Sequence, residues 1–388
     1  MIHYIDELTK GDLKGKKVLL RLDLNVPIKD GEIEDATRLD KIIPTVDYLR
    51  EKEAQVIIIS HLENKEGENE SLFLVWNYLN GFFPVEFCPS YFTPESVEKI
   101  LNLKDKGVLL FENVRFNVGE KENDQDFAKK LSQMGDIYVN DSFAVGHRKH
   151  ASLTTLPYLM PHYGGLLLKE EIKHLSKAFN PKRPFVFILG GAKFDTKLPL
   201  IKKYLEKADF VFVAGALTSD LFKAKGFEVG TSLVSEGNFD LKGVIDNPKL
   251  VLPVDVTVTN KAGDVSFKKP EDVKKSDCIV DVGPETLEQL KTLLNGVKTV
   301  LWNGPLGNYE AGFSDKTESL AGLLAELTSK GAETILGGGD SIASIHKLNL
   351  AHKFTFISTG GGAMLEYLVN ENLPALQALE DEQKVENL

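Results

Sequence analysis

The stretch Phe185-Val-Phe-Ile-Leu-Gly-Gly-Ala-Lys193 indicates the fold class of this 388-residue chain. Its first five residues are apolar, without the alternation of polar and apolar side chains that marks a strand with one face in water. Two glycines follow at once, as in a turn between a strand and a helix. The pattern predicts a parallel strand that helices cover on both faces.

Similar apolar runs recur along the whole chain. In the first half they are Lys17–Leu22, Gln55–Ser60, Val85–Phe87, Val108–Phe111 and Ile137–Asn140. In the second half they also include Phe210–Ala214, Val251–Pro253, Cys278–Val282, Thr299–Trp302, Thr334–Leu336 and Phe354–Ser358. Amphipathic segments typical of helices lie between them, among them Gln125–Met134, Leu287–Leu294 and Thr317–Leu327. This alternation predicts an α/β protein with a doubly wound, Rossmann-like parallel sheet in each half.

The length of the chain favours two domains, because a single core seldom grows beyond about 250–300 residues. Residues 166–179 read as one amphipathic helix that ends before Asn180-Pro181. We therefore predict a first domain over 1–165, an inter-domain helix over 166–180 and a second domain over 181–374.

Composition limits the classes of function. A hydrophobic fraction of 42% with 27% charged residues is typical of a soluble globular protein. The net charge of −11 argues against general affinity for nucleic acid, which requires a basic surface. The N-terminal residues lack the pattern of a signal peptide, and no apolar run approaches the roughly 20 residues that cross a membrane. Cys88 and Cys278 show no metal-ligand spacing, and we expect two reduced thiols in a cytoplasmic protein.

Arginines and glycine-rich turns divide between the two halves. The chain has only six arginines, of which four lie in or just after apolar runs of the first half: Arg21, Arg38, Arg115 and Arg148. The others, Arg50 and Arg183, are expected at the surface. The second half offers the glycine-rich turns Gly190–Lys193, Gly337–Ser341 and Gly360–Ala363. Guanidinium groups suit planar anions, and glycine turns that open helices suit polyphosphates, so we expect two anionic ligands.

Several strings, in one order, resemble the phosphoglycerate kinase family over essentially the whole chain. In the first half they are Arg21–Pro27 followed by Arg38, then Ser60–Leu62, Glu112–Phe116 and His147–Ser152. In the second half they are Gly190–Lys193, Leu252–Asp255, Trp302–Pro305, Gly337–Ser341 and Ser358–Ala363.

The resemblance implies reversible phosphoryl transfer between ATP and the carboxylate of 3-phosphoglycerate, giving ADP and 1,3-bisphosphoglycerate in glycolysis and gluconeogenesis. It implies that the N-terminal domain binds the triose and the C-terminal domain binds the Mg²⁺-nucleotide. It also implies a monomer whose domains close around a hinge, with a C-terminal segment of about 375–388 packing on the first domain. Small-molecule substrates would be the only partners, with neither nucleic acid nor membrane.

The resemblance also assigns roles to residues of this chain. The implied triose site contains Asp23, Asn25, Arg38, His61, Asn64, Arg115 and Arg148. The implied nucleotide site contains Gly191, Lys193, Lys197, Gly215, Asn303, Glu310, Gly338, Gly339, Asp340 and Ser341, with Asp340 as the Mg²⁺ ligand. The implied catalytic groups are Arg38 beside the reacting carboxylate, Lys193 on the transferred phosphoryl group and Gly361 at a helix N-terminus facing it. This chemistry needs no general base, because a carboxylate acceptor is already ionised at neutral pH.

Two stretches depart from the family pattern. Ser60-His61-Leu62 is usually followed by Gly-Arg-Pro, but here by Glu63-Asn64-Lys65, so one triose-site arginine is missing and an acid is added. Because a lysine cannot reproduce the guanidinium fork, we predict weaker triose binding than in typical relatives. In Ala214–Leu221 a stretch usually richer in glycine carries Asp220, which leaves the adenine contacts open.

Two other functions remain as alternatives at this level. A nicotinamide-dependent dehydrogenase would also use doubly wound domains, but the chain lacks G-x-G-x-x-G after a strand. A catalytically weakened family member acting as a nucleotide- or anion-binding protein is the second alternative. Binding of Mg-ATP without turnover would favour it.

Overall fold

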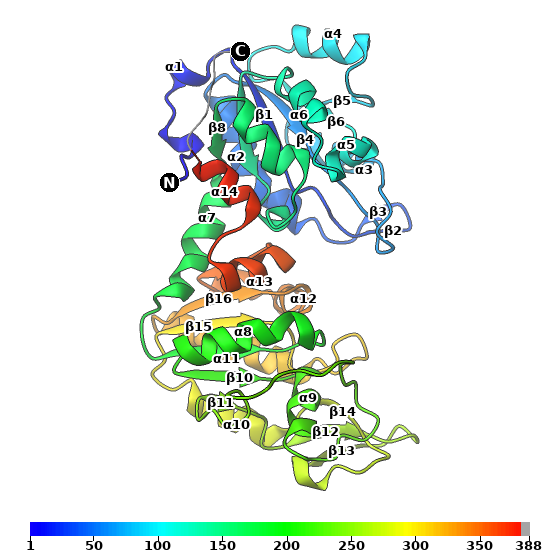
Figure 1. Ribbon diagram of the computed structural model, residues 1–388, viewed down its shortest axis with the longest axis vertical. Coiled ribbons are helices and arrows are strands. Elements are labelled where there is room, and N and C mark those ends of the chain that lie inside the picture. The colour runs from blue at the N-terminus through cyan, green and yellow to red at the C-terminus, as the bar shows by residue number, and fades with distance from the viewer. Residues whose placement is uncertain (382–388) are drawn as a thin grey trace. The chain divides into compact units, whose positions relative to one another are not determined.

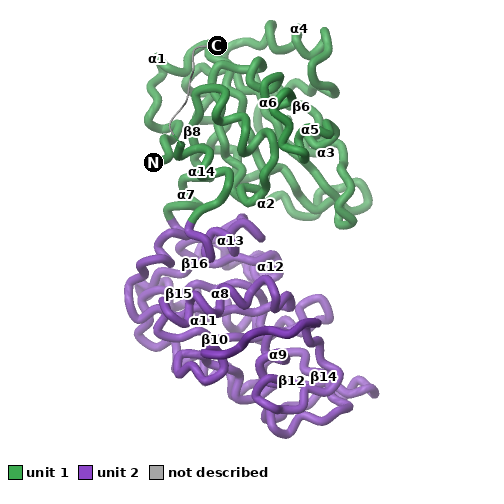
Figure 2. The backbone as a smooth tube through the Cα atoms, in the orientation of Figure 1, with its two compact units in different colours: residues 1–173, 372–388 green, residues 174–371 purple. Residues whose placement is uncertain are grey.

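The computed structural model describes residues 1–381, and this part of the chain forms two compact units (Figures 1 and 2). The first unit contains Met1–Lys173 together with the chain from Asn372 onward, and the second is His174–Glu371. Each unit is built on a six-stranded sheet in which every pairing is parallel. The predicted α/β class with two doubly wound parallel sheets is confirmed.

The sheet of the first unit has the strand order β5-β6-β4-β1-β7-β8. Its strands are β1 (Lys17–Leu22), β4 (Gln55–Ile59), β5 (Glu86–Cys88), β6 (Val108–Phe111), β7 (Ile137–Asp141) and β8 (His162–Gly164), and β2 (Ile28–Lys29) with β3 (Glu32–Ile33) forms a separate hairpin. The helices are α1 (Lys10–Leu13), α2 (Thr37–Glu51), α3 (Phe73–Leu79), α4 (Pro94–Asn102), α5 (Val118–Lys121), α6 (Gln125–Ser132), α7 (Leu166–Leu175) and α14 (Pro374–Glu380). Helices α2 and α3 pack on the sheet face that carries Val18 and Leu20, while Leu19 on the other face is equally buried. Burial of both faces explains why the strands are apolar throughout.

The sheet of the second unit has the order β11-β10-β9-β15-β16-β17. Its strands are β9 (Phe185–Leu189), β10 (Phe210–Val213), β11 (Leu250–Val251), β15 (Thr299–Asn303), β16 (Glu333–Gly337) and β17 (Phe356–Ile357). The helices are α8 (Phe194–Lys207), α9 (Leu217–Ala224), α10 (Pro284–Leu293), α11 (Asp315–Ser329), α12 (Gly339–Lys347) and α13 (Gly361–Asn370). Leu290 of α10 and Leu324 of α11 join the core on one face, where Trp302 is fully buried. On the other face Phe187 meets Tyr204 of α8, with ring centroids 4.6 Å apart.

One run was assigned to the wrong kind of sheet. Cys278–Val282 forms β14, which pairs antiparallel with β12 (Val256–Thr259) in a separate three-stranded sheet of order β13-β12-β14. Strand β13 (Val265–Lys268) is largely exposed, so this sheet keeps one edge in water. Antiparallel sheets tolerate such exposure, whereas parallel sheets are covered on both faces, and the apolar run alone could not distinguish the two.

Helix α7 joins the two units and is anchored at its first turn. The predicted single helix over 166–179 is α-helical only to Leu175 and continues as a 3₁₀ turn, Ser176–Phe179. The Asp141 carboxylate, at the end of β7, accepts a hydrogen bond from the backbone N–H of Leu168 at 2.8 Å. Burial raises the pKa of Asp141 to about 6. This carboxylate therefore ties the connecting helix to the end of strand β7.

The C-terminal segment returns to the first unit. The backbone N–H of Ala375 in α14 donates to the Gly146 carbonyl oxygen at 3.0 Å, and the Tyr158 hydroxyl donates to Asp381 at 2.7 Å. The predicted segment of about 375–388 extends beyond these contacts, and its residues 382–388 lie outside the described part of the chain. Within residues 1–381, no helix is both long and apolar enough to cross a bilayer.

Candidate active site

A pocket of about 670 Å³ opens in the second unit, where the carboxyl ends of β9, β15 and β16 meet. Ligands of doubly wound sheets bind at this edge because the strand-to-helix turns converge there. Ten predicted residues line it: Gly191, Lys193, Lys197, Gly215, Asn303, Glu310, Gly338, Gly339, Asp340 and Gly361. The eleventh, Ser341, is fully buried in α12 and is not part of the pocket lining.

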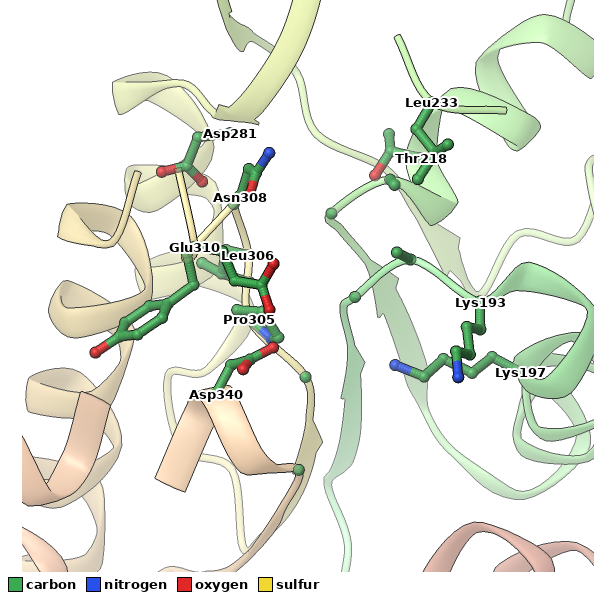
Figure 3. Close-up of a pocket in the computed structure, with 18 of the residues that line it drawn as sticks. Lys193, Lys197, Thr218, Leu233, Asp281, Pro305, Leu306, Asn308, Glu310 and Asp340 are labelled. Carbon is green, nitrogen blue, oxygen red and sulfur yellow. The ribbon is translucent and has the colours of Figure 1, made fainter. Parts of the chain in front are cut away.

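Two lysines of α8 provide the positive charge of this pocket. Lys193 occupies the N-cap position of the helix with an exposed side chain, and Lys197 follows one turn later with 9% of its surface exposed. The Lys197 ammonium group donates to the Gly190 carbonyl oxygen. Figure 3 shows both lysines across the pocket from Asp340 and Glu310. The pocket can therefore receive phosphate oxygens on one side and a metal or ribose on the other.

The charge of Lys197 should make nucleotide binding depend on pH. Burial lowers the pKa of Lys197 to about 8. The negative charge of Asp340 opposes this shift, and the positive charge of Lys193 adds to it. The ammonium form is present below that pH and is lost above it. We expect the Kd for Mg-ADP, measured by calorimetry, to rise by up to about tenfold per pH unit above pH 8. Lys197→Met should bind weakly with a flat profile, and equal slopes in both proteins would contradict this role.

Glycine is required at Gly190 because two backbone segments touch there. A Cβ on Gly190 would lie 1.9 Å from the carbonyl oxygen of Pro305. The turn after β9 thereby packs directly against the turn after β15, where the backbone N–H groups of Gly190 and Gly191 donate to the carbonyl oxygens of Asn303 and Pro305 at 2.8 and 3.1 Å.

Gly190→Ala should therefore destabilise the second unit. We expect a loss of about 1–3 kcal/mol or more, because a methyl group at this distance forces the two turns apart. Thermal unfolding monitored by circular dichroism measures the change. Gly322→Ala is the matched control, since a Cβ in that part of α11 meets nothing within 4 Å and should be stabilising. Equal melting temperatures for the two variants would refute the contact.

The opposite wall of the pocket carries the carboxylates of Asp340 and Glu310. Asp340 lies in the first turn of α12, and burial, followed by the charge of Glu310, raises the pKa of its carboxyl group. In the described residues no group donates a hydrogen bond to the Asp340 side chain, and no cluster of three or more metal-binding side chains exists. Mg²⁺ commonly binds through one or two carboxylates together with substrate phosphates and water. Asp340 suits that mode of binding.

Sequence reasoning missed four residues that line another part of the pocket. Its lining includes Thr218, Leu233, Asp281 and Asn308, which come from α9, from loops and from β14. Burial raises the pKa of Asp281 to about 7. No local pattern marks these residues, because only the folding of the antiparallel sheet beside the main sheet brings them together.

Asp220, which departs from the family pattern, makes a structural hydrogen bond and does not line the pocket. Its carboxylate accepts a hydrogen bond from the backbone N–H of Ser235 at 2.9 Å, and the residue is outside the pocket lining. Asp220 thus fastens the loop that carries Leu233 to α9, and Thr218 is the α9 residue that reaches the pocket.

A basic cluster occupies the corresponding strand ends of the first unit. It consists of Arg21, Arg38, His61, Arg115, Arg148 and His150. Burial and then the charges of Arg21, Arg115 and Arg38 hold the pKa of His61 well below its usual value. For His150, burial and then Arg115, Arg21 and Arg148 lower the pKa to about 4. Both histidines are therefore neutral at pH 7, and the three predicted triose arginines lie within electrostatic reach of them.

Polar contacts position Arg38, His61 and Arg148 of the basic cluster. Arg38 in α2 pairs with Asp23 at 3.1 Å and donates to the backbone carbonyl of Asn25 at 2.8 Å. His61 lies 4.0 Å from Asp23. Arg148 is exposed and donates to His147 at 3.0 Å. These contacts place four predicted triose residues, Asp23, Asn25, Arg38 and His61, in one neighbourhood.

Arg21, for which the sequence predicts no role in the site, is the most deeply buried arginine of this cluster. It is fully buried, and its Nε donates to the Ser152 hydroxyl at 2.9 Å. That hydroxyl in turn donates to the buried Glu120 carboxylate at 2.6 Å, while Arg21 Nη2 lies 3.3 Å from His61 Nδ1. Arg21 thus links a buried acid to the histidine of the cluster.

The remaining predicted residue, Asn64, makes its described contacts within a local turn. Its side chain accepts from the Glu68 backbone N–H at 2.8 Å and donates to the Glu68 carboxylate at 3.0 Å. Its neighbour Glu63 forms an ion pair with Arg115, with 2.5 Å between Oε2 and Nη1. The departure from the family pattern therefore lies directly against the basic cluster.

Comparisons with known proteins agree on one family. A family model described as phosphoglycerate kinase matches residues 6–371. Phosphoglycerate kinase from Thermosipho africanus is 42% identical over 393 aligned residues, which cover 97% of this chain and 98% of that protein. Cytosolic phosphoglycerate kinase from Nicotiana tabacum is 39% identical, with coverage of 97% and 98%. A solved structure of phosphoglycerate kinase from Coxiella burnetii has a TM-score of 0.83 and 34% identity, and covers 98% of this chain and 99% of that one.

Proposed function

The chain belongs to the phosphoglycerate kinase family, and from that membership we propose how its residues carry out the reaction. The enzyme is a kinase that transfers a phosphoryl group to a carboxylate. The first unit binds 3-phosphoglycerate at the basic cluster, and the second binds ATP or ADP in the 670 Å³ pocket. The observation that carries this assignment is the pocket in which Lys193 and Lys197 face Asp340 and Glu310.

The chemical step needs positioning and charge rather than proton transfer. In the direction of ATP consumption, an oxygen of the substrate carboxylate bonds to the γ-phosphorus while the bond from that phosphorus to the β,γ-bridging oxygen breaks. ADP leaves with the electron pair of the broken bond, and no proton moves. The neutral histidines of the basic cluster are consistent with this step, because a hydrogen-bonding role requires no titration near pH 7.

Each catalytic group has a role that follows from its charge and position. Arg38, held by Asp23 and Asn25, orients the reacting carboxylate. Lys193, at the beginning of α8, neutralises charge on the transferred phosphoryl group. Gly361 supplies a backbone N–H at the N-terminus of α13, where the helix dipole favours an anion.

Mg²⁺ would be held by Asp340 together with the nucleotide phosphates. When bound, the ion would neutralise phosphate charge and fix the conformation of the polyphosphate. On the facing wall Lys197 holds nucleotide phosphate, whereas Glu310, on the same wall as Asp340, accepts hydrogen bonds from the ribose hydroxyls.

Transfer requires the two ligands to meet, since a near-attack geometry brings the reacting atoms to about 3–3.5 Å. We therefore propose a hinge-bending motion around residues 166–179 that closes the enzyme and excludes water. Small-angle scattering should show a smaller radius of gyration when 3-phosphoglycerate and Mg-ADP are both present. An unchanged radius in the ternary mixture would contradict closure.

We further propose that the enzyme is a cytoplasmic monomer acting in glycolysis and gluconeogenesis. Light scattering during size-exclusion chromatography tests the monomer, which should have a mass near 43.0 kDa. Nothing in the family matches favours the alternative of a nucleotide- or anion-binding protein without turnover.

The decisive experiment is steady-state turnover of 3-phosphoglycerate and Mg-ATP. The product is reduced by glyceraldehyde-3-phosphate dehydrogenase, and NADH oxidation is followed by absorbance. Turnover that depends on both substrates supports the function. Nucleotide binding without turnover would support the alternative instead.

A further inference from the structure

Glu63 contacts two residues that are proposed to bind the triose, Arg115 through its carboxylate and Asn25 through its backbone. Its Oε2 lies 2.5 Å from Arg115 Nη1, and its Oε1 lies 3.1 Å from Lys121 Nζ. Its backbone N–H donates to Asn25 Oδ1 at 2.9 Å. Glu63 therefore contacts the proposed triose site through both its side chain and its backbone.

The turn that carries Glu63 holds the residue in this position. Glu63 forms a β-bridge with Asn69, and the Asn69 side chain donates to the Arg115 carbonyl oxygen at 2.9 Å. Across the turn, the backbone N–H of Asn64 donates to the Glu68 carbonyl oxygen at 2.9 Å. These contacts fix the backbone of Glu63 beside Arg115. The ion pair therefore does not depend on a long side chain that reaches across solvent.

The carboxylate of Glu63 is ionised at neutral pH. Burial opposes ionisation of Glu63, but the hydrogen bonds and charges of Arg115 and Lys121 lower the pKa of its carboxyl group below the usual value. The Arg115 side chain is only 2% exposed, and its Nε has no hydrogen-bond partner among residues 1–381. The Glu63 carboxylate therefore binds Nη1 of this buried guanidinium, while its Nε–H donates no hydrogen bond to the described residues.

We propose that Glu63 is an intramolecular competitor for the triose site, whose carboxylate occupies Arg115 in the free enzyme until an anionic group of the substrate displaces it. This inference rests on the proposed function, because it takes Arg115 as a triose-binding residue. When a site is available only in a fraction of molecules, the measured Kd is raised by the inverse of that fraction. Glu63 thus sets the affinity for the triose, and this effect acts in addition to the absent arginine at position 64.

Glu63→Gln tests this role with little change in shape. The charge that pairs with Arg115 is removed, so the Kd for 3-phosphoglycerate, measured by isothermal titration calorimetry, should fall on the order of tenfold. The KM for 3-phosphoglycerate should fall in parallel, whereas kcat should stay within about twofold, because the competitor has left before the chemical step. Glu63→Ala should also lower the Kd. This second variant controls for a residual hydrogen bond between the introduced glutamine and Arg115.

Glu66→Gln is the matched control, because it removes the same charge from the exposed part of the same turn. Its Kd should equal that of the unmodified protein, and a fall equal to that in Glu63→Gln would mean that only the net charge matters. An unchanged or higher Kd in both Glu63 variants, with normal turnover of the unmodified enzyme, overturns the competitor role alone. If neither the unmodified protein nor the variants bind 3-phosphoglycerate or turn over, the proposed function fails, and this inference fails with it.

Discussion

Lys193→Ala is expected to lower kcat by about 10²–10³-fold, because it removes a positive charge placed where charge is transferred. Lys193 occupies the N-cap position of α8, its side chain is exposed, and its cap makes no side-chain hydrogen bond. The fold should therefore tolerate the substitution. The KM for Mg-ATP should change much less than kcat, since Lys197, Asp340 and the glycine turns still hold the nucleotide.

The coupled assay with saturating 3-phosphoglycerate measures this effect. Lys202→Ala is a suitable control, because Lys202 belongs to the same helix and its nearest acid is Asp240, at 3.7 Å. It should retain normal turnover. If Lys193→Ala raised KM for Mg-ATP with an unchanged kcat, Lys193 would bind ground-state phosphate and would have no special role in the transfer.

Arg38→Ala should also lower kcat by about 10³-fold, because the reacting carboxylate loses the guanidinium that orients it and balances its charge. The substitution has a second consequence inside the protein. Asp23 is 5% exposed and loses its ion pair at 3.1 Å, so a moderate loss of stability should accompany the loss of activity.

Stability and catalysis can be separated by a second substitution. Arg38→Lys keeps a positive charge near Asp23 and should restore the melting temperature, yet it should stay at least about tenfold below normal activity because an ammonium cannot form the planar fork. Arg50→Ala controls for loss of an arginine from the other end of α2, where Arg50 pairs with Asp47. Full activity in Arg38→Ala would exclude the assigned role of Arg38.

The sequence by itself determined that the main sheets are parallel and which residues lie at the carboxyl ends of their strands. Continuous apolar runs such as Phe185–Leu189 require cover on both faces, and that requirement specifies a parallel sheet between helices. The residues just after the runs were also predictable, since the carboxyl ends of parallel strands share one edge. This is why Lys193 and Asp340, far apart in the chain, were expected together and do line one pocket.

Only the tertiary structure decided which neighbours these residues acquire. The run Cys278–Val282 has the composition of a parallel strand but pairs antiparallel with Val256–Thr259, which brings Asp281 to the pocket. Likewise, the sequence showed an added acid at Glu63 but could not show that it faces Arg115, 52 positions later in the chain. The local sequence pattern indicates whether a residue will be buried or exposed. Which distant residue it contacts is decided by long-range packing. The glycine turns and arginines could therefore be read from the chain, and the ion pair that holds one of those arginines could not.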